Sequence, residues 1–222
     1  MSAANASAVT LASEKVGPLL YGGTFDPVHQ GHLQVARAVA EAAGQPVRMM
    51  PAALPPHRAE PGATDQQRLA MLQLAIADQP LLQLDDRELH RSGPSYSVLT
   101  LRECAAANER PALILGWDAY CGLPSWREPE AILTLAILIV VPRPQASASL
   151  PAPLQRGWSA RRPLSASSLA EAHAGDVLLC PMPEHPASAT AIRTALRAGV
   201  RCPEGLPAAV AAYIEEHKLY AS

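Results

Sequence analysis

Short runs of apolar residues alternate with helical patterns along most of this chain, and this order restricts the fold more than any other feature of the sequence. The apolar runs are mostly continuous, which is typical of strands that are buried on both faces of a sheet. They cover residues 19–21, 47–50, 81–84, 112–115, 136–141 and 177–180. Each run has the length of a strand, and none is long enough to cross a membrane as a helix.

Helical patterns lie between most of these runs and after the last one. Thr64 and Gln67 form the pattern of a capping box, and Gly44 suits the end of a helix. The predicted helices cover residues 33–43, 65–77, 97–107, 189–198 and 207–217. Strands and helices in this alternation predict an α/β fold with a doubly wound, mainly parallel, Rossmann-like sheet, which binds ligands at the carboxyl ends of its strands.

Length and composition indicate one domain of ordinary size and restrict its partners. The chain has 222 residues, with 18 basic and 20 acidic side chains, so we expect no broad basic face for nucleic acid. We also expect no membrane span. The cysteines form no C-x-x-C pair and predict free thiols in a reducing cytoplasm. They are Cys104, Cys121, Cys180 and Cys202.

Two segments depart from the alternating pattern. Residues 1–16 are rich in Ala and Ser and lack the features of a secretory signal, so we predict a disordered extension ahead of a domain over 17–222. Pro, Ala and Ser dominate between about residues 142 and 175. This composition predicts an irregular surface excursion.

The segment from Gly22 to His32, GGTFDPVHQGH, joins the first predicted strand to the first predicted helix. Unpaired N–H groups and the positive end of the helix dipole gather at such a turn, and a glycine such as Gly31 lets a phosphate approach the backbone. Residues three apart are neighbours on a helix, so His29 is expected to face the same phosphate as His32. The sequence predicts a nucleotide-phosphate site here.

A metal site is the alternative explanation for this histidine pair, because imidazole is the commonest metal ligand among side chains. A catalytic zinc needs three protein ligands in a defined geometry. No third ligand stands at a suitable spacing, and the cysteines are scattered along the chain. We therefore predict no metal bound by the protein itself.

A stiff loop, Pro55-Pro56-His57-Arg58, follows the second predicted strand. It offers two donor groups, and the planar fork of Arg58 suits a phosphate monoester. The alternative is an exposed turn that binds nothing.

The third predicted helix begins at Ser95-Tyr96-Ser97. The backbone amides of Tyr96 and Ser97 would point out of a positive helix end and could receive a carboxylate. The alternative is simple capping of the helix by Ser95, and both can hold together.

Two further groups follow later strands. Asp118 ends the fourth strand and suits ribose hydroxyls, while Trp126 suits stacking on a flat heterocycle, although core or rim packing is its alternative. In Ser188-Ala189-Thr190-Ala191-Ile192-Arg193, the hydroxyls of Ser188 and Thr190 and the guanidinium of Arg193 could converge on β- and γ-phosphates. An ordinary capped helix with a surface arginine fits that segment as well.

The residues from Gly23 to Leu33 resemble the signature of the HxGH nucleotidyltransferases, which use both histidines on a nucleotide triphosphate. Together the motifs from Leu20 to Tyr220 resemble the bacterial nicotinate-nucleotide adenylyltransferases. This resemblance implies that ATP, carrying Mg²⁺, and nicotinate mononucleotide react to give deamido-NAD and pyrophosphate. It implies in-line attack of the mononucleotide phosphate on the α-phosphorus of ATP. The assembly is expected to be a monomer or a small homo-oligomer.

The same resemblance implies roles for the residues of these motifs. The catalytic residues would be His29, His32 and Arg193. ATP would be bound by these three together with Gly23, Thr24, Phe25, Ser188 and Thr190. Nicotinate mononucleotide would be bound by His57, Arg58, Tyr96, Ser97, Asp118 and Trp126.

Mild departures from the family pattern are Ser97 for the common threonine, Arg58 for lysine, and His185-Pro186-Ala187 where isoleucine usually precedes the serine. A pantetheine-phosphate adenylyltransferase or a cytidylyltransferase would share the histidine turn but would not explain the Pro-Pro loop or Trp126. A catalytically silent nucleotide-binding protein is disfavoured, because both histidines and Arg193 are intact.

Overall fold

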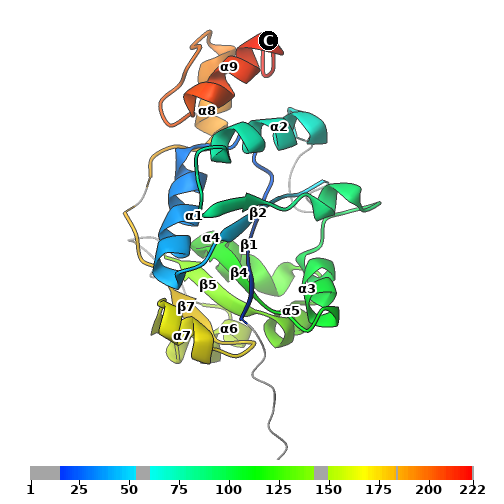
Figure 1. Cartoon of the computed structure of the whole chain (residues 1–222), viewed down its shortest axis with the longest axis vertical. Helices are drawn as coiled ribbons and strands as arrows, with labels where there is room; N and C mark the ends of the chain where they lie inside the picture. Colours follow the sequence, from blue (N-terminus) through cyan, green and yellow to red (C-terminus); the bar gives the residue numbers. More distant parts are fainter. Residues whose placement is uncertain (1–15, 54–60, 143–149, 184, 222) are drawn as a thin grey trace, which may run out of the picture.

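The computed structural model describes residues 16–53, 61–142, 150–183 and 185–221. Within these residues the chain forms a seven-stranded parallel sheet with the order β3-β2-β1-β4-β5-β7-β6 (Figure 1). The strands are β1 (Val16–Gly23), β2 (Val47–Pro51), β3 (Leu82–Leu84), β4 (Arg110–Gly116), β5 (Ile137–Val141), β6 (Arg162–Pro163) and β7 (Val177–Leu179). Every predicted strand forms, and the α/β fold with a doubly wound parallel sheet is confirmed.

The predicted helices also form, with ends that shift by up to three residues. The helices are α1 (Gln30–Ala43), α2 (Asp65–Ile76), α3 (Ser97–Ala106), α4 (Trp117–Gly122), α5 (Pro129–Leu135), α6 (Ala152–Ser159), α7 (Ala166–Glu171), α8 (Ala189–Arg197) and α9 (Ala208–Glu216), with 3-10 turns η1 (Arg87–His90) and η2 (Leu123–Ser125). Gly44 ends α1 with a φ of 67°, and Thr64 forms the predicted capping box with Gln67. The sequence did not predict α4 to α7.

The strands send alternate side chains into two cores, one on each face of the sheet. In β4, Ala112 and Ile114 belong to the core that α1, α2, α8 and α9 cover, whereas Leu113 and Leu115 belong to the core that α3, α4, α5 and α6 cover. Helix α9 packs against α2, and α8 lies at the same end of the molecule (Figure 1). Because both faces are covered, each position of a central strand can be apolar, which explains the continuous runs.

The strand order places a binding crevice between β1 and β4. The chain winds outward from β1 to β3 and then returns to the other side of β1 with β4. Sheets of this kind bind ligands outside the carboxyl ends of the strands at such a reversal. Since β1 ends at Gly23 and β4 at Gly116, the histidine turn and Asp118 both lie at this edge.

Residues 142–175, predicted to be an irregular excursion, contain α6, β6 and α7. Their prolines occupy positions where a missing N–H does little harm: Pro151 and Pro153 lie at the start of α6, and Pro163 lies in the short edge strand β6. Ser165 caps α7 by accepting from the Ser168 amide. In the described part of this segment, the prolines therefore lie at the start of a helix and in an edge strand, and not in irregular chain.

The predicted N-terminal extension lies outside the described residues except for Val16, which begins β1. Among the residues that the structure describes, no helix is long and apolar enough to span a bilayer.

Candidate active site

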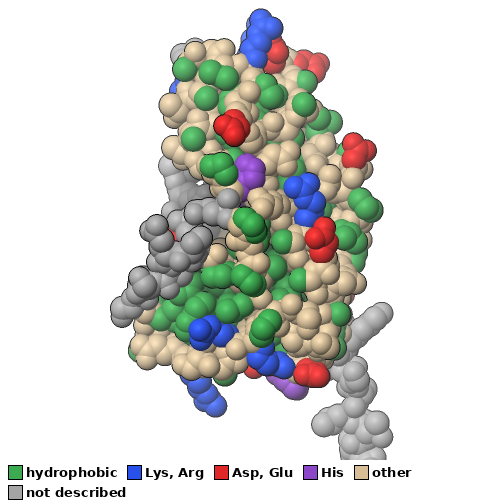
Figure 2. Space-filling model, turned by 90° about the vertical axis from the view of Figure 1, so that its left-hand side faces the viewer, with side chains coloured by type: hydrophobic (Ala, Val, Ile, Leu, Met, Phe, Trp, Pro, Cys, Tyr) green, Lys and Arg blue, Asp and Glu red, His purple; other side chains and the backbone are tan. Residues whose placement is uncertain are grey.

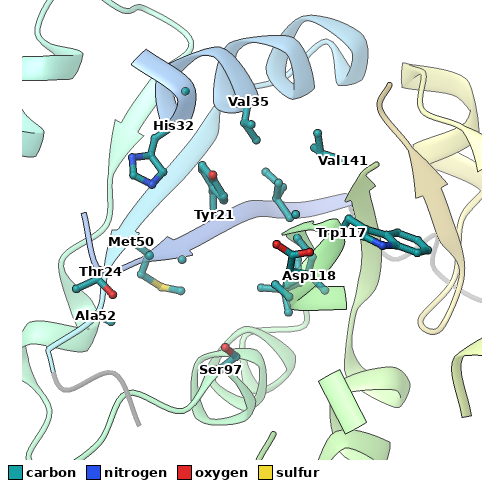
Figure 3. Close-up of a pocket in the computed structure, with 18 of the residues that line it drawn as sticks. Tyr21, Thr24, His32, Val35, Met50, Ala52, Ser97, Trp117, Asp118 and Val141 are labelled. Atoms are coloured by element: carbon teal, nitrogen blue, oxygen red, sulfur yellow. The ribbon is translucent and has the colours of Figure 1, made fainter. Parts of the chain in front are cut away.

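A cavity of about 630 Å³ opens at the carboxyl ends of β1 and β4. In Figure 3, Thr24 and His32 lie on one side of it, and Asp118 approaches from the other. Ser97, at the start of α3, forms part of a third wall. The predicted site residues that line the cavity are Gly23, Thr24, His29, His32, Tyr96, Ser97, Asp118 and Trp126.

The two histidines of the turn are stacked on each other. Their ring centroids are 3.7 Å apart, with 25° between the ring planes. His29 is the N-cap residue of α1, and its backbone N–H donates to Nδ1 of His32 over 3.3 Å. A neutral imidazole whose Nδ1 accepts a hydrogen bond carries its proton on Nε2. The turn therefore fixes both the stacking and the tautomer of neutral His32.

Burial keeps His29 uncharged at neutral pH. The side chain is 7% exposed, and burial, followed by the nearby His185, lowers the pKa of His29 to about 4. In the described part of the chain, its Nδ1 is buried without a hydrogen-bond partner. A Cβ added at Gly31 would lie 3.1 Å from this Nδ1, so the glycine leaves the space that the His29 ring occupies.

Phe25 packs against the histidine turn, on the ring of His32, and its side chain does not line the cavity. Its ring is 1% exposed and meets His32 edge-on at 5.0 Å and Tyr21 edge-on at 6.0 Å. Its backbone is left-handed, with a φ of 49°. A Cβ at Gly23 would come within 2.9 Å of the Phe25 ring, which explains the glycine before the turn.

The opposite wall carries the residues predicted to bind a mononucleotide. Tyr96 is the N-cap residue of α3, so the Ser97 amide belongs to the first turn, where N–H groups have no partner within the helix. The alternative explanation, in which Ser95 caps this helix, is wrong, because the N-cap residue is Tyr96 and the Ser95 Oγ accepts from the Ala53 amide at 2.9 Å. Trp126 is half-buried at the end of η2, beside the same cavity.

The two tryptophans that follow β4, Trp117 and Trp126, have different surroundings. Trp117 is 6% exposed, and its ring points away from the cavity centre in Figure 3. It packs against Trp158 with ring centroids 4.9 Å apart. Asp118, the next residue, is exposed toward the cavity from the first turn of α4.

The predicted β- and γ-phosphate group on α8 lies beside the cavity and does not line it. Ser188 caps α8, its Oγ accepting from the Ala191 amide at 3.2 Å, so the capping alternative holds for this residue. Arg193 donates to the backbone oxygen of Asp26 at 2.7 Å and lies 3.8 Å from its carboxylate. Arg193 Nη2 also reaches Thr190 Oγ1 at 3.5 Å.

A polar network beneath the histidine turn was missed by the sequence analysis. The Asp26 carboxylate accepts from the Tyr220 hydroxyl at 2.6 Å and from the Gly62 and Ala63 amides at 2.9 and 3.2 Å. Burial, then the bond to Asp26, raises the pKa of Tyr220, so the hydroxyl stays a donor. Together with Arg193, three segments that are distant from Asp26 in the sequence converge on its carboxylate.

Arg68 completes this network from α2. Its guanidinium is fully buried and donates to the carbonyls of Thr24 at 2.6 Å and Ala52 at 2.7 Å, and to the Asp65 carboxylate at 2.6 Å. The available signal was spacing, because Arg68 falls at helical intervals from the buried Met71 and Ala75. A charged residue inside such a face indicates a buried partner set.

Other residues that line the cavity carried no sequence signal, since they are ordinary apolar positions or lie far apart along the chain. They include Tyr21, Val35, Met50, Glu88, Arg127 and Met182. The predicted phosphate-binding residues His57 and Arg58 lie outside the described residues. No cluster of three or more His, Cys, Asp and Glu side chains suited to a metal ion occurs in the described ranges.

Figure 2 shows one outer face of the molecule. On this face the Lys and Arg side chains of the described residues are dispersed among acidic and apolar side chains. Charge is therefore mixed over this face, in agreement with the near balance of 18 basic and 20 acidic residues.

Comparison with known proteins identifies close relatives over nearly the whole chain. A family model described as cytidylyltransferase-like matches residues 20–195. The "Probable nicotinate-nucleotide adenylyltransferase" of Stenotrophomonas maltophilia is 45% identical over 214 residues, covering 92% of this chain and 96% of that protein. The protein of the same description from Klebsiella pneumoniae is 42% identical over 206 residues, covering 90% and 95%.

Solved structures share the fold at lower identity. The Plasmodium falciparum nicotinic acid mononucleotide adenylyltransferase complexed with NaAD aligns with a TM-score of 0.67 and 18% identity, covering 92% of this chain and 97% of that chain. The same enzyme complexed with APC aligns with a TM-score of 0.62 and 17% identity, covering 91% and 96%. These matches support the architecture described above.

Proposed function

Since the chain belongs to the nicotinate-nucleotide adenylyltransferases, within the cytidylyltransferase-like family, we infer that it transfers the adenylyl group of ATP to nicotinate mononucleotide in NAD biosynthesis. A phosphate oxygen of the mononucleotide attacks the α-phosphorus of ATP. The bond from that phosphorus to the bridging oxygen breaks in line, giving deamido-NAD and pyrophosphate. The observation that carries this proposal is the stacked histidine pair at the start of α1, on the wall of the cavity.

We assign the ATP phosphates to the histidine turn. His32 and His29 would donate hydrogen bonds to phosphate oxygens as negative charge builds on them, and the Gly23, Thr24 and Phe25 backbone would lie against the nucleotide. Donors already fixed in place need little rearrangement at the moment of transfer. The stacked rings and the support of Phe25 favour this role.

We assign Arg193, Ser188 and Thr190 to the leaving pyrophosphate. Arg193 rests on Asp26 one turn into α8, next to the histidine turn. A triphosphate would offer the Arg193 guanidinium charged oxygens in place of the neutral backbone oxygen of Asp26 to which it now donates.

The mononucleotide would occupy the other side of the cavity. The amides of Tyr96 and Ser97 suit the nicotinate carboxylate, Trp126 suits the pyridine ring, and Asp118 suits a ribose. His57 and Arg58 would hold the phosphate monoester. They follow Ala53 in the sequence, and the Ala53 amide donates to Ser95 Oγ on this wall.

Mg²⁺ would enter as part of the ATP substrate and neutralise charge on its phosphates. We further propose a reducing, cytoplasmic setting, which the free cysteines support, and a monomer or small homo-oligomer. Size-exclusion chromatography with light scattering tests the assembly.

The activity is tested by incubating the purified protein with MgATP and nicotinate mononucleotide and measuring deamido-NAD and pyrophosphate. Parallel reactions replace ATP by CTP, or the mononucleotide by phosphopantetheine. Product only with CTP or phosphopantetheine would favour the related enzymes. Tight ATP binding without pyrophosphate release, whatever the acceptor, would favour a silent nucleotide-binding protein.

A further inference from the structure

Arg127 is a cation on the wall of the cavity, outside the set of residues assigned above. Among the described residues that line the cavity, it is the only lysine or arginine. The acidic residues on the same lining are Glu88 and Asp118. Both proposed substrates are anions, which neighbouring carboxylates disfavour, so a single guanidinium on this wall affects which anions bind.

Arg127 lies against the start of α3. Its Cζ is 4.8 Å from the centroid of the Tyr96 ring, within the range of a cation stacked on an aromatic face. Tyr96 is the N-cap residue of α3, so this contact places the guanidinium beside the helix end whose amides are assigned to the nicotinate carboxylate. The Arg127 side chain is 55% exposed, which leaves its N–H groups accessible to a ligand.

Glu128 holds this part of the chain against α3 without consuming the charge of Arg127. Arg102 of α3 donates to both carboxylate oxygens of Glu128, at 3.3 Å and 2.5 Å, whereas Arg127 Nε lies 3.6 Å from one of them. Glu128 directly follows Arg127 and is the N-cap residue of α5. Two guanidinium groups share one carboxylate here, so one positive charge remains in excess beside α3.

Trp126 sets the place of the guanidinium relative to the pyridine ring. Trp126 and Arg127 are neighbours in the sequence, and both line the cavity. The Trp126 amide donates to the Leu123 carbonyl at 2.9 Å, which fixes the backbone at the end of η2. Trp126 is assigned to the face of the pyridine ring. The carboxylate lies at the edge of that ring, so groups beside the tryptophan are the ones that can contact it.

We propose that Arg127 is a specificity-determining residue for nicotinate mononucleotide, donating to the nicotinate carboxylate together with the Tyr96 and Ser97 amides. This inference rests on the proposed function. A guanidinium forms charge-assisted hydrogen bonds with a carboxylate, whereas a neutral carboxamide offers it a single uncharged acceptor. The charge of Arg127 therefore adds to the discrimination between acid and amide that the helix end provides.

The test compares Arg127→Gln with the wild type on nicotinate mononucleotide and on nicotinamide mononucleotide. The glutamine removes the charge and keeps a planar polar group at the end of the side chain. We expect kcat/KM for the nicotinate form to fall about tenfold or more, as for a lost hydrogen bond to a charged group. We expect kcat/KM for the nicotinamide form and KM for ATP to stay within about twofold. Arg127→Lys keeps the charge without the planar fork and is expected to recover part of the loss.

Arg161→Gln is the matched control. Arg161 is exposed, stacks on the Trp158 ring with Cζ 4.6 Å from its centroid, and does not line the cavity, so this change removes an equal charge from a similar contact. Equal falls for both mononucleotides in Arg127→Gln would place the guanidinium at the phosphate or ribose that they share and overturn the proposal. An unchanged kcat/KM for the nicotinate form, or an equal effect of Arg161→Gln, would also overturn it.

Binding is measured apart from turnover. Titration calorimetry with a non-hydrolysable ATP analogue present gives Kd for each mononucleotide in the wild type and in Arg127→Gln. Absence of wild-type turnover would count against the proposed function alone, since a Kd that rises for the nicotinate form only would still support recognition of the carboxylate by Arg127. Equal Kd values for the two forms in the wild type would contradict that recognition.

Discussion

His29 and His32 occupy the same turn, yet their surroundings give them different properties. His29 is 7% exposed, and burial lowers its pKa to about 4, so it meets a substrate as a neutral ring. His32 is half-buried, lies edge-on to Phe25 and accepts from the His29 backbone through Nδ1. Each neutral ring keeps one N–H donor, which is what a phosphate oxygen requires.

We expect His32→Ala to lower turnover by about 100-fold to 1000-fold, as for the loss of one preorganised donor to a developing oxyanion. Pyrophosphate release measures turnover, and circular dichroism with thermal unfolding checks the fold. His173→Ala makes the same substitution at an exposed position. Near-normal turnover in His32→Ala, or an equal fall in the control, would contradict the role.

The buried, neutral His29 also predicts how stability depends on pH. The unfolded chain takes up a proton on this imidazole near pH 6.5, whereas the folded chain does so only near pH 4. Protons therefore bind the unfolded state preferentially between these values, and His29 contributes a loss of stability as pH falls from about 6.5 toward 4, with no contribution above that window.

Urea unfolding at pH 7.5, 6.0 and 5.0 tests this dependence in the wild type and in His29→Gln. The difference between the two slopes is expected to approach at most about 1.4 kcal/mol per pH unit. Carboxylates that titrate in the same range affect both proteins and cancel in the difference. Identical slopes would show that His29 is not buried as a neutral ring.

At the level of elements, three helices begin at the wall of the cavity. His29 is the N-cap residue of α1, Tyr96 is the N-cap residue of α3, and Asp118 lies in the first turn of α4. Each helix follows the carboxyl end of a strand or the loop beyond it, so several N–H rich ends meet at one edge of the sheet. Anionic groups of two substrates can therefore bind without a broad basic surface.

The start of α3 predicts a preference between two mononucleotides. A carboxylate gains from the positive helix end and its amides, whereas the neutral carboxamide gains much less. We expect kcat/KM to favour nicotinate mononucleotide over nicotinamide mononucleotide by about tenfold or more. Pyrophosphate release with each substrate measures the ratio, and equal rates would reject the assignment of the Tyr96 and Ser97 amides.

The lengths of the helices show which of them sequence patterns can predict. Helices of 12 and 14 residues, α2 and α1, were predicted from their spacing and caps. Helices α4 and α7, of six residues each, were missed. A segment of that length is not stable alone, and its helix forms only because tertiary contacts hold it.

At the scale of the whole molecule, Tyr220, near the end of the sequence, is hydrogen-bonded to Asp26 in the turn after β1. Tyr220 donates to Asp26 over 2.6 Å across 194 residues of sequence, and Asp26 in turn contacts Arg193 of α8. Arg68 adds bonds from α2 to the carbonyl of Thr24. The turn that carries both histidines is thus held by segments from almost the full length of the chain.

Removing the Tyr220 hydroxyl is expected to destabilise the protein, because its hydrogen bond to Asp26 is lost. We expect Tyr220→Phe to lower the free energy of unfolding by about 1.5–3 kcal/mol, because a buried carboxylate loses a donor. Tyr213→Phe, at a half-buried tyrosine that stacks on His217, is the control and is expected to change it by less than about 0.5 kcal/mol. Urea unfolding measures both, and similar values for the two variants would contradict the assigned contact.

The sequence by itself determined the parallel sheet, the longer helices and the histidine turn, since each helix, strand and turn has a local pattern and the alternation of strands and helices indicates a parallel sheet. It also supplied Asp118, Trp126 and the α3 amides as candidates, through their position after strands. Only the tertiary structure decided that Ser95 bridges to Ala53, that Arg193 rests on Asp26, and that Glu88 lines the cavity. The physical reason is that hydrogen bonds between distant segments depend on how helices pack on the sheet, which no local pattern specifies.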